Sequence, residues 1–503
     1  MKDWLTICHH YATRMQILQW TSVLQAFGGA QGGSNRQYTG FESLYAEVVK
    51  KVDDIAKQIV LHVSTEVDLP QAEMFSNRFL GVVEILRQEG HPAAKMFLIG
   101  LVLRTQEILC HGDSLALRVR AIVDFYYSQG ARLAYCDNDT VDSLEDLIDR
   151  VSWSNVEQGI IHGQLCGVTQ NGPIYANILK LTERTIWPKD FRGLAGVFSS
   201  QLEKIGCAHG VSGGFFLYSE ADICFPEQRG DPVGLLVSQG VICNPPVFNR
   251  GALLQYADGQ IEIRRLGMEE VAIVFQSETI ISPFSVNQVA DLGTKICCFN
   301  RAFGTISPTF NGSVISIAGH EVLCKSNEPV SIPLNGFVLC FPNAMLPDVA
   351  EGESVSYQFL NGRALVAGIA GGPILLHCKE PTLDLASEDF SQTAPPITFS
   401  QDETFDQNLL PRLGVGITAS QELIFVAVDG RNFEKSLGIT LHGLAKLLAN
   451  LGCVAGLNLD GGSSKRMVVG GRMVDLSRTT IETANKRANK IRPIRSGIAI
   501  LPN

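Results

Sequence analysis

The sequence predicts an α+β protein in which an N-terminal helical domain, residues 1–150, is followed by a mixed α/β domain, residues 151–503. Apolar residues in the first part recur at three- and four-residue steps, which is typical of helices. After Trp153 the apolar runs become short or alternating, and glycine and proline separate them, as in a β-rich chain. A chain of 503 residues is also long for a single hydrophobic core, so two or more domains are expected.

The N-terminal part has the pattern of a helical bundle. Helical spacing of apolar residues runs from Phe41 to Ile59 and recurs over Val82–Leu86, Phe97–Ile108 and Leu115–Tyr126. Ser143 is placed to cap a last helix that ends near Val151. Such a bundle suits binding of a protein partner, oligomerisation, occlusion of a site, or a purely structural cap.

Strands are expected throughout the second part, where apolar runs are bounded by turn residues. The runs are Ile174–Leu181, Gly234–Val237, Ile261–Ile263, Val271–Phe275, Val314–Ile317 and Phe337–Phe341. The polar, acidic segment Pro381–Gln407 is predicted to be a surface loop or flap.

A strand–helix–strand unit is predicted near the C-terminus. The apolar run Glu422–Val428 leads into Asp429, and the run Val454–Leu459 leads into Asp460. Between them, Thr440 can cap a helix that Gly452 is placed to end. If this unit is a parallel crossover, both aspartates leave the sheet at one edge, roughly 5 Å apart for adjacent strands and twice that if one strand intervenes.

Two carboxylates at one sheet edge suit glycosyl chemistry. One carboxyl group can protonate a leaving oxygen while the other stabilises positive charge or activates water. The loop after Asp460 adds two glycines, two hydroxyls and two cations, which are groups that hold an anionic substrate. The plainer alternative is that both aspartates only cap loops.

Several motifs, in order along the chain, resemble the phosphodiester glycosidase family. They are Val211–Phe216, Gly234–Gly240, Ile332–Gly336, Gly371–Pro373, Pro411–Gly416, Val428–Arg431, Leu459–Gly462 and Arg492–Pro493. The resemblance covers the chain from near residue 153 to the C-terminus, and so many ordered matches are specific as a set.

The resemblance implies cleavage of the bond between the anomeric carbon of a sugar, of the N-acetylglucosamine kind, and a phosphodiester oxygen. The products are a free sugar and a phosphomonoester, and the substrate is a sugar-phosphodiester or a nucleotide sugar. The implied catalytic residues are Asp460, Asp429 and Ser464. Substrate binding is assigned to Ser212, Gly213, Gly214, Arg412, Arg431, Gly461, Gly462, Lys465, Arg466 and Arg492.

Three residues depart from the family pattern. Ser212 stands where members usually have asparagine, Arg466 where they generally have threonine, and Lys465 where a small residue is common. The two cations either bind a more anionic substrate or obstruct the pocket, and the second alternative leaves a non-catalytic protein that binds phosphorylated sugars or nucleotides. A third alternative is an interaction protein that acts through its helical domain.

The composition argues against several other classes of function. The net charge of −10 disfavours nucleic acid as a partner. The histidines are scattered and form no metal-binding motif, so no cofactor is expected, although a divalent cation held by Asp429 or Asp460 would leave little trace in the sequence. Apart from the uncharged stretch Met15–Ser34, no uncharged apolar run is long enough to predict a membrane span.

The cysteines indicate a compartment. Thirteen cysteines, an odd number, are spread without a framework and often have apolar neighbours, as around Cys297, Cys298 and Cys340. Buried free thiols and a reducing, cytoplasmic location are therefore expected. The uncharged stretch from Met15 to Ser34 leaves a signal peptide, and thus secretion, as the alternative.

Overall fold

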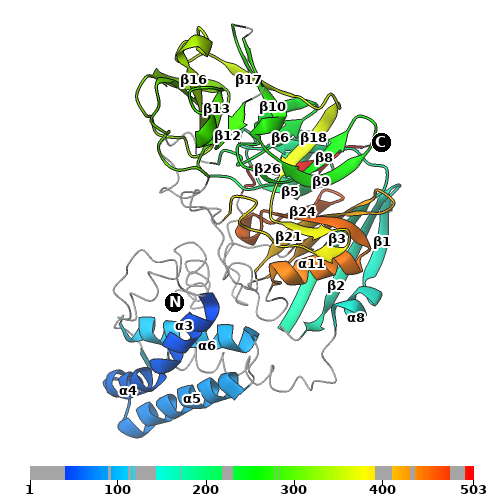
Figure 1. The fold of residues 1–503 in the computed structure, drawn as a ribbon. Helices are drawn as coiled ribbons and strands as arrows, with labels where there is room; N and C mark the ends of the chain where they lie inside the picture. The colour runs from blue at the N-terminus through cyan, green and yellow to red at the C-terminus, as the bar shows by residue number, and fades with distance from the viewer. Residues whose placement is uncertain are drawn as a thin grey trace.

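The structure is a computed structural model, shown in Figure 1, in which a group of helices precedes a large β-rich part. It describes residues 40–88, 92–110, 115–116, 119, 143–169, 172–217, 230–277, 279–282, 284–390, 410–430, 436, 438–475 and 493–502.

Four of the described helices, all near the N-terminus, pack around a core of their own. They are α3 (Gly40–Lys50), α4 (Val52–Val63), α5 (Leu69–Gln88) and α6 (Pro92–Leu109). Ile59, Phe79 and Val102 are fully buried within this core. The helices predicted over 41–59, 82–86 and 97–108 are thus confirmed, whereas most of Leu115–Tyr126 lies outside the described residues.

A short helix marks the approach to the β-rich part. Helix α8 (Leu144–Asp149) begins at Ser143, whose side chain accepts a hydrogen bond from the backbone N–H of Asp146, as a capping box requires. Leu147 of α8 packs into a core shared with the large sheet, not with the N-terminal helices. The domain boundary near residue 150 stays a prediction.

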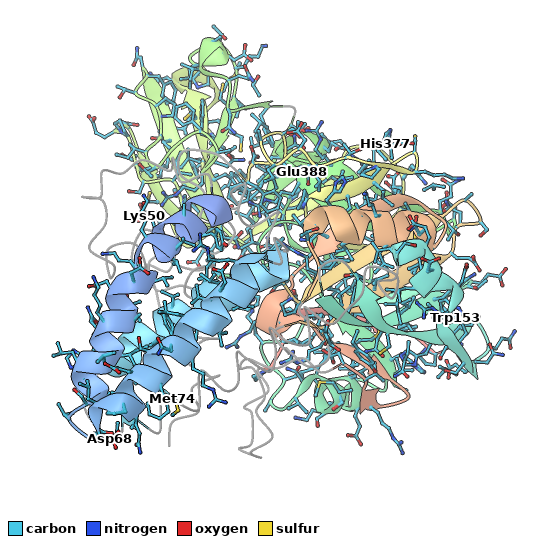
Figure 2. All side chains as sticks on the ribbon, turned by 90° about the horizontal axis from the view of Figure 1, so that it is seen from below. Lys50, Asp68, Met74, Trp153, His377 and Glu388 are labelled. Atoms are coloured by element: carbon cyan, nitrogen blue, oxygen red, sulfur yellow. The ribbon has the colours of Figure 1, made fainter. Side chains whose placement is uncertain are left out.

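The strands in the described residues form five sheets. The largest has the order β1-β2-β3-β22-β21-β23-β19-β20, with β1 (Ser152–Glu157), β2 (Ile160–Thr169), β3 (Gly172–Leu181), β22 (Leu423–Val428), β21 (Arg412–Thr418), β23 (Cys453–Leu459), β19 (Ile374–His377) and β20 (Glu380–Pro381). Trp153 is nearly half exposed on the edge strand β1 (Figure 2).

Two five-stranded sheets pack near it. One has the order β25-β24-β5-β26-β4, with β25 (Arg472–Met473), β24 (Met467–Val469), β5 (His209–Ser212), β26 (Ser496–Ile500) and β4 (Ile186–Asp190). The other has the order β7-β6-β18-β8-β9, with β7 (Val241–Asn244), β6 (Leu236–Ser238), β18 (Leu365–Ala370), β8 (Arg250–Tyr256) and β9 (Ile261–Leu266).

The remaining described strands form two further sheets, which share a hydrophobic core with the sheet that contains β8 and β9. A three-stranded sheet pairs β11 (Ile280–Ile281), β10 (Val271–Phe275) and β17 (Val355–Phe359). A five-stranded sheet has the order β12-β13-β16-β14-β15, with β12 (Ser285–Val286), β13 (Cys297–Asn300), β16 (Gly336–Pro342), β14 (Gly312–Ala318) and β15 (Glu321–Ser326). The six predicted strand segments all fall on or beside observed strands.

The predicted fold class is wrong for the second domain. Among the described strands every pairing is antiparallel except that of β12 with β13, so the domain consists mainly of antiparallel sheets and is not a mixed α/β layer structure. The prediction gave too much weight to the single strand–helix–strand unit near the C-terminus. Helix α11 (Leu441–Asn450) does connect two strands of the same direction, but the antiparallel strand β21 lies between them.

The central strands of the large sheet are buried on both faces. Along β22, Ile424 and Val426 point into the core under α8 and α11, while Phe425 points into the core shared with the two neighbouring five-stranded sheets. This double burial explains why Glu422–Val428 reads as one continuous apolar run instead of an alternating one.

Helix α11 packs closely on β21 because that strand carries glycine on the helix side. The side chain of Thr440 accepts a hydrogen bond from the N–H of Gly443 at the start of the helix, and Gly452, with φ +90°, follows its end, so both predicted signals are confirmed. A Cβ at Gly414 would meet the Leu444 side chain, and one at Gly416 would overlap Cys453. Only a residue without a side chain leaves room for these contacts.

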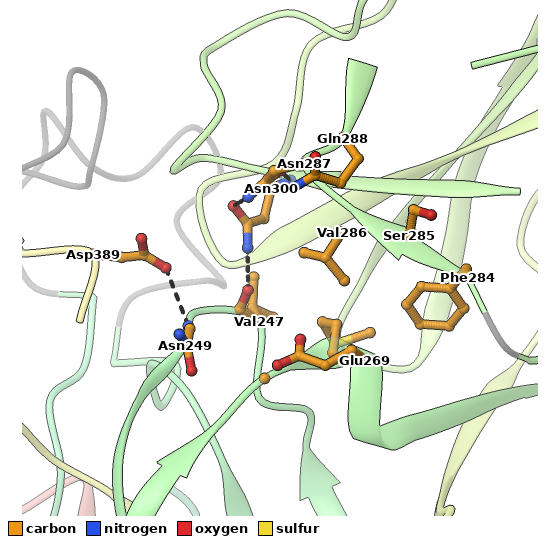
Figure 3. Close-up of a pocket in the computed structure, with 12 residues that line it drawn as sticks. Val247, Asn249, Glu269, Phe284, Ser285, Val286, Asn287, Gln288, Asn300 and Asp389 are labelled. Carbon is orange, nitrogen blue, oxygen red and sulfur yellow. Dashed lines mark hydrogen bonds between the residues drawn. The ribbon is translucent and has the colours of Figure 1, made fainter. Parts of the chain in front are cut away.

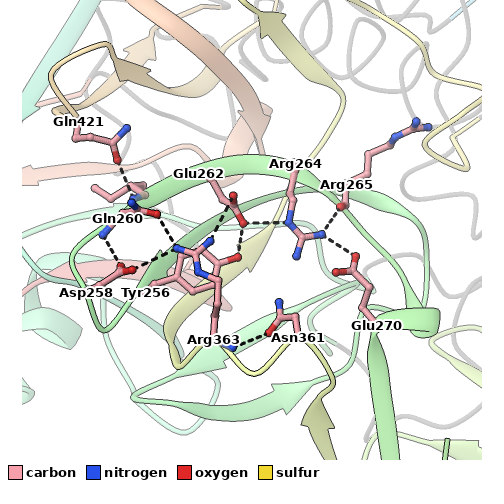
Figure 4. Close-up of polar contacts among 11 residues, drawn as sticks. Tyr256, Asp258, Gln260, Glu262, Arg264, Arg265, Glu270, Asn361, Arg363 and Gln421 are labelled. Carbon is pink, nitrogen blue, oxygen red and sulfur yellow. Dashed lines mark hydrogen bonds and ion pairs between the residues drawn. The ribbon is translucent and has the colours of Figure 1, made fainter. Parts of the chain in front are cut away.

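A network of charged side chains covers the hairpin formed by β8 and β9 (Figure 4). Arg264 bridges Glu262 at 3.0 Å and Glu270 at 2.6 Å. The guanidinium of Arg363 stacks over the ring of Tyr256, 3.5 Å from its centroid. Burial, followed by the bond to Glu262, raises the pKa of Tyr256.

Five of the described cysteines are both buried and free. They are Cys207, Cys297, Cys298, Cys340 and Cys453, and burial raises the pKa of each thiol. The expectation of buried free thiols is confirmed for these positions, whereas the reducing compartment stays a prediction. None of the described helices is both long and apolar enough to cross a membrane.

We expect Gly416→Ala to lower the free energy of unfolding by about 1–3 kcal/mol, because the new methyl group overlaps the Cys453 side chain. Urea denaturation measures the change. The double variant with Cys453→Ala should lose less than the sum of the two single changes. Gly193→Ala, whose Cβ meets no atom within 4 Å, is the control; equal losses at positions 416 and 193 would contradict the packing argument.

Candidate functional site

The two predicted aspartates follow strands that end at the same edge of the large sheet. Asp429 follows β22 and Asp460 follows β23, and β21 separates the two strands. In the register of the sheet, Arg412 lies opposite Val428, and Leu413 lies opposite Leu459. With one strand between them, the two positions are about 10 Å apart along the sheet.

Asp429 is buried, with only 1% of its surface exposed. Its backbone N–H donates to the carbonyl of Tyr175 at 2.8 Å, and its carbonyl accepts the hydroxyl of Ser436 at 2.5 Å. One carboxylate oxygen accepts a hydrogen bond from Lys465 Nζ at 2.5 Å. Burial and the neighbouring Asp429 carboxylate together raise the pKa of Tyr175.

Lys465 lies between two carboxylates. Its side chain is fully buried, and Nζ lies 2.5 Å from Asp429 Oδ1 and 3.2 Å from Asp475 Oδ2. A buried cation with two anionic partners is neutralised inside the protein, so this arrangement favours a structural role over contact with substrate. The sequence pattern predicts neither the burial of Lys465 nor its ion pair with Asp475.

Asp460 is more accessible than Asp429. It is partly exposed, and its backbone N–H donates to the carbonyl of Gly213 at 3.0 Å. The N–H of Gly213 in turn donates to Ser496 at 3.0 Å. Strand β26 and the segment after β5 therefore hold the backbone from which the Asp460 carboxylate projects.

The segment Ser212–Gly214 lies against the loop that follows Asp460. Ser212 Oγ accepts the N–H of Arg466 at 2.9 Å, and the N–H of Ser212 donates to the carbonyl of Arg466 at the same distance. A Cβ on Gly214 would overlap the carbonyl of Ala370. These two motifs, more than 240 positions apart, are thus brought together, and the need for glycine at 214 is steric.

The two arginines of the described site are buried. Arg466 is fully buried and donates from Nη1 to the carbonyl of Lys465 at 2.5 Å. Arg412, 2% exposed, donates from Nε to the carbonyl of Ile439 at 3.0 Å. Each guanidinium thus donates at least one hydrogen bond to the backbone, and its burial limits the directions from which a substrate phosphate could approach it.

The glycines after Asp460 lie against the start of β21. The N–H of Gly462 donates to the carbonyl of Pro411 at 2.8 Å, and a Cβ on Gly461 would lie 2.6 Å from that oxygen. Gly462–Ser464 forms one turn of 3₁₀ helix, in which the N–H of Ser464 donates to Gly461 at 3.1 Å. Ser464 is partly exposed.

Asn458 holds the motif Gly371–Pro373 beside the aspartates. Its side-chain amide donates to the carbonyl of Gly372 at 2.8 Å, and its backbone N–H donates to Pro373 at 3.1 Å. Gly372 donates back to the carbonyl of Asn458 at 2.8 Å. Sequence reasoning missed Asn458, although a buried asparagine in an otherwise apolar run was the signal that could have revealed it.

Two predicted substrate-binding residues, Arg431 and Arg492, lie outside the described residues. Within the described part of the chain, no cluster of three or more His, Cys, Asp or Glu side chains could hold a metal ion. The roles assigned to individual site residues therefore stay predictions.

The histidines near the site have protein partners or face solvent. His162 lies 3.0 Å from the amide oxygen of Asn177, and His442 is exposed on α11. His209 is buried in β5, where Nδ1 accepts the N–H of Gly470 at 3.2 Å and Nε2 lies 3.6 Å from Glu157. Burial lowers the pKa of His209, although Glu157 opposes the shift.

We expect acidification to destabilise the wild type through His209. The unfolded chain takes up this proton near pH 6.5, whereas the buried ring takes it up only at lower pH, so this contribution to stability is lost as the pH falls. The measurement is the free energy of unfolding at pH 7.5 and 5.5. His209→Gln should lose less than wild type over this range, and identical losses would contradict the assignment.

We expect Lys465→Met to be strongly destabilising, by about 3–5 kcal/mol, because it leaves two buried carboxylates without their cation. Urea denaturation measures the loss. Adding Asp429→Asn and Asp475→Asn should restore part of it. Lys446→Met, at an exposed position on α11, should change stability by less than about 0.5 kcal/mol; a similar effect at both lysines would overturn the buried ion cluster.

Comparison with solved structures finds partial similarity. A hypothetical protein from Synechocystis is 20% identical over 70% of this chain and 63% of that one, so the chain spans less than two thirds of its length, with a TM-score of 0.44. A protein described as exported, from Burkholderia pseudomallei, is 21% identical over 66% of this chain and 75% of that one, with a TM-score of 0.43.

A third similar structure is the catalytic domain of zebrafish N-acetylglucosamine-1-phosphodiester α-N-acetylglucosaminidase, auto-inhibited by its pro-peptide. It is 12% identical over 70% of this chain and 88% of that one, with a TM-score of 0.40. None of the curated proteins matches the sequence. The family resemblance is confirmed by a family model: residues 346–501, which contain Arg412, Asp429 and Asp460, match the phosphodiester glycosidase family.

Proposed function

We propose that the protein is a hydrolase that cleaves the bond between a sugar and a phosphodiester. The observation that carries the proposal is the convergence of Asp460, Arg412 and the segment Ser212–Gly214 at one edge of the large sheet. The match of residues 346–501 to phosphodiester glycosidases supports this reaction class. A sugar of the N-acetylglucosamine kind is the substrate that we propose.

In the proposed reaction the bond between the anomeric carbon and the phosphodiester oxygen breaks, and its electron pair leaves with the phosphate. Water supplies the new hydroxyl on the anomeric carbon, so the products are a free sugar and a phosphomonoester. The partly exposed Asp460 carboxylate would stabilise positive charge on the sugar or attack the anomeric carbon. Phosphate is a good leaving group, so stabilising its departing charge matters more than protonating it.

Asp429 would act through its neighbours. Because it is 1% exposed and paired with Lys465, it is poorly placed to touch a sugar. Its main-chain bonds to Tyr175 and Ser436 hold the end of β22, and its ion pair with Lys465 holds the loop that follows Asp460. We therefore assign Asp429 a positioning role. We propose that Ser464, on the loop that follows Asp460, contacts the substrate.

The pairing of Asp429 with Lys465 also favours a second candidate, a non-catalytic protein that binds phosphorylated sugars or nucleotides. A glycosidase with two working carboxylates needs both to be accessible, and here one is buried and neutralised. Binding without turnover would distinguish this candidate. A protein partner for the helical region and a cytoplasmic location remain proposals based on the sequence alone.

We expect the wild type to release free sugar from UDP-N-acetylglucosamine or from the N-acetylglucosamine phosphodiester of methyl mannoside. Asp460→Asn should reduce kcat about 10³-fold, because it removes the accessible carboxylate. Chromatographic measurement of free sugar gives the rates. Asp348→Asn, at an exposed position inside the same matched region, is the control and should keep wild-type activity.

Two outcomes would contradict the proposal. If the wild type binds either substrate saturably and releases no sugar, the non-catalytic alternative replaces the hydrolase. If Asp460→Asn and Asp348→Asn are equally active, the chemistry does not depend on Asp460.

A further inference from the structure

A cavity of about 440 Å³ lies where the sheet containing β8 and β9 meets the sheet containing β12 and β13 (Figure 3). Its volume is that of a small-molecule pocket. Asp389 and Asn249 lie on one side of it in the figure, and Phe284 and Ser285 lie on the other. The lining residues are Val247, Asn249, Gly267, Met268, Glu269, Phe284, Ser285, Val286, Asn287, Gln288, Asn300 and Asp389.

Part of the wall is fixed by hydrogen bonds within the protein. Asn287 donates from its amide to Asn300 Oδ1 at 3.0 Å, and its own amide oxygen accepts the N–H of Asn300 at 3.1 Å. The amide nitrogen of Asn300 also donates to the carbonyl of Val247. Ser285 donates to Asp291 at 2.5 Å. The cavity is therefore bounded by a rigid frame that needs no ligand to form.

Three other polar side chains of the lining are not used in this way. The side chains of Asn249, Glu269 and Gln288 make no hydrogen bond to any described residue. Glu269 and Gln288 are exposed at the rim, whereas Asn249 is half-buried. Because these two amides and one carboxylate are not bonded to described protein groups, they offer both hydrogen-bond donors and acceptors to a ligand.

Two lining residues adopt a backbone conformation that is uncommon outside glycine. Asn287 has φ 53° and Asp389 has φ 58°. Asn and Asp tolerate this region better than other residues do, but it is sparsely populated and often found where a site is built. Asp389 also accepts the N–H of Asn249 at 3.1 Å, so it orients the residue whose amide lines the cavity.

The chemistry of the lining selects the class of ligand. The described lining residues include the carboxylates Glu269 and Asp389 and no Lys, Arg or His, so a phosphate or other anion would be repelled. Amides and carboxylates that bond hydroxyl groups, beside the apolar surface of Phe284 and Met268, suit a polyhydroxylated ring with one apolar face. We propose that this cavity binds a neutral saccharide. The proposal rests on the cavity and does not depend on hydrolysis at Asp460.

The cavity and the candidate catalytic site share one loop. Asp389 follows Glu388, which is 3% exposed and accepts the N–H of Ile374 at 2.7 Å, directly after the motif Gly371–Pro373. Glu388 also accepts the N–H of Gly251 at 2.8 Å, at the start of β8. A sugar seated in the cavity would therefore lie beside a segment that Asn458 holds next to the two aspartates.

Ligand-observed saturation-transfer NMR on the full chain tests the proposal, with the methyl glycosides of N-acetylglucosamine and mannose and with inorganic phosphate as probes. We expect saturable binding of a methyl glycoside, weakened about tenfold by Asn249→Ala and by Glu269→Ala. Gln288→Ala, at the exposed rim, should weaken binding as well and leave the fold intact, since the Gln288 side chain makes no hydrogen bond to any described residue. Glu328→Ala, exposed elsewhere, should bind like wild type.

Measurements on Asp460→Asn separate this proposal from the proposed function. We expect this variant to bind the methyl glycoside as wild type does, whether or not the wild type shows turnover. Absence of glycoside binding would overturn the saccharide site. So would binding that none of the changes at 249, 269 and 288 weakens, or inorganic phosphate that displaces the glycoside.

Discussion

The arrangement of the site depends on one constraint, the burial of β21 between β22 and β23 with protein on both faces of the sheet. A strand in that position must be narrow toward α11 and bulky toward the opposite core, and the alternation of Gly414 and Gly416 with branched residues meets both requirements. Because β21 is antiparallel to both neighbours, Arg412 at its start lies at the edge where β22 and β23 end. The approach of Asp429, Arg412 and Asp460 thus follows from backbone packing before any side chain at the site is considered.

The charges at this edge are divided between structural and accessible groups. Lys465 and Asp429 neutralise one another in the interior, together with Asp475, and Arg412 and Arg466 each donate a hydrogen bond to a main-chain carbonyl. Asp460 remains partly exposed. Lys465 and Arg466 are both fully buried, so we interpret them as part of a charged core that holds the loop from which Asp460 projects.

Local signals predicted the helices and strands well, since capping residues and apolar periodicity act over a few positions. Thr440 and Gly452 delimit α11, and Val271–Phe275 is a strand with the predicted ends. The fold class failed because strand direction is set by partners far along the chain, and no local pattern shows that β21 lies between β22 and β23. For the same reason the sequence did not predict the ion pair of Asp475 with Lys465 or the hydrogen bonds of Asn458 to Gly371–Pro373. The proximity of Ser212 and Arg466 could have been inferred only from the family resemblance.

The part of the chain that matches the family model is not a structural unit by itself. Strand β5, which lies before residue 346, is inserted between β24 and β26 and carries Ser212 at its end. Strand β3 pairs with β22, strand β8 with β18 and strand β10 with β17, so the matched segment supplies only some of the strands in each of four sheets. Cutting before residue 346 would expose several strand edges and remove Gly213, the acceptor for the N–H of Asp460. The candidate site is therefore a property of the whole β-rich part, and its geometry requires residues that the family model does not cover.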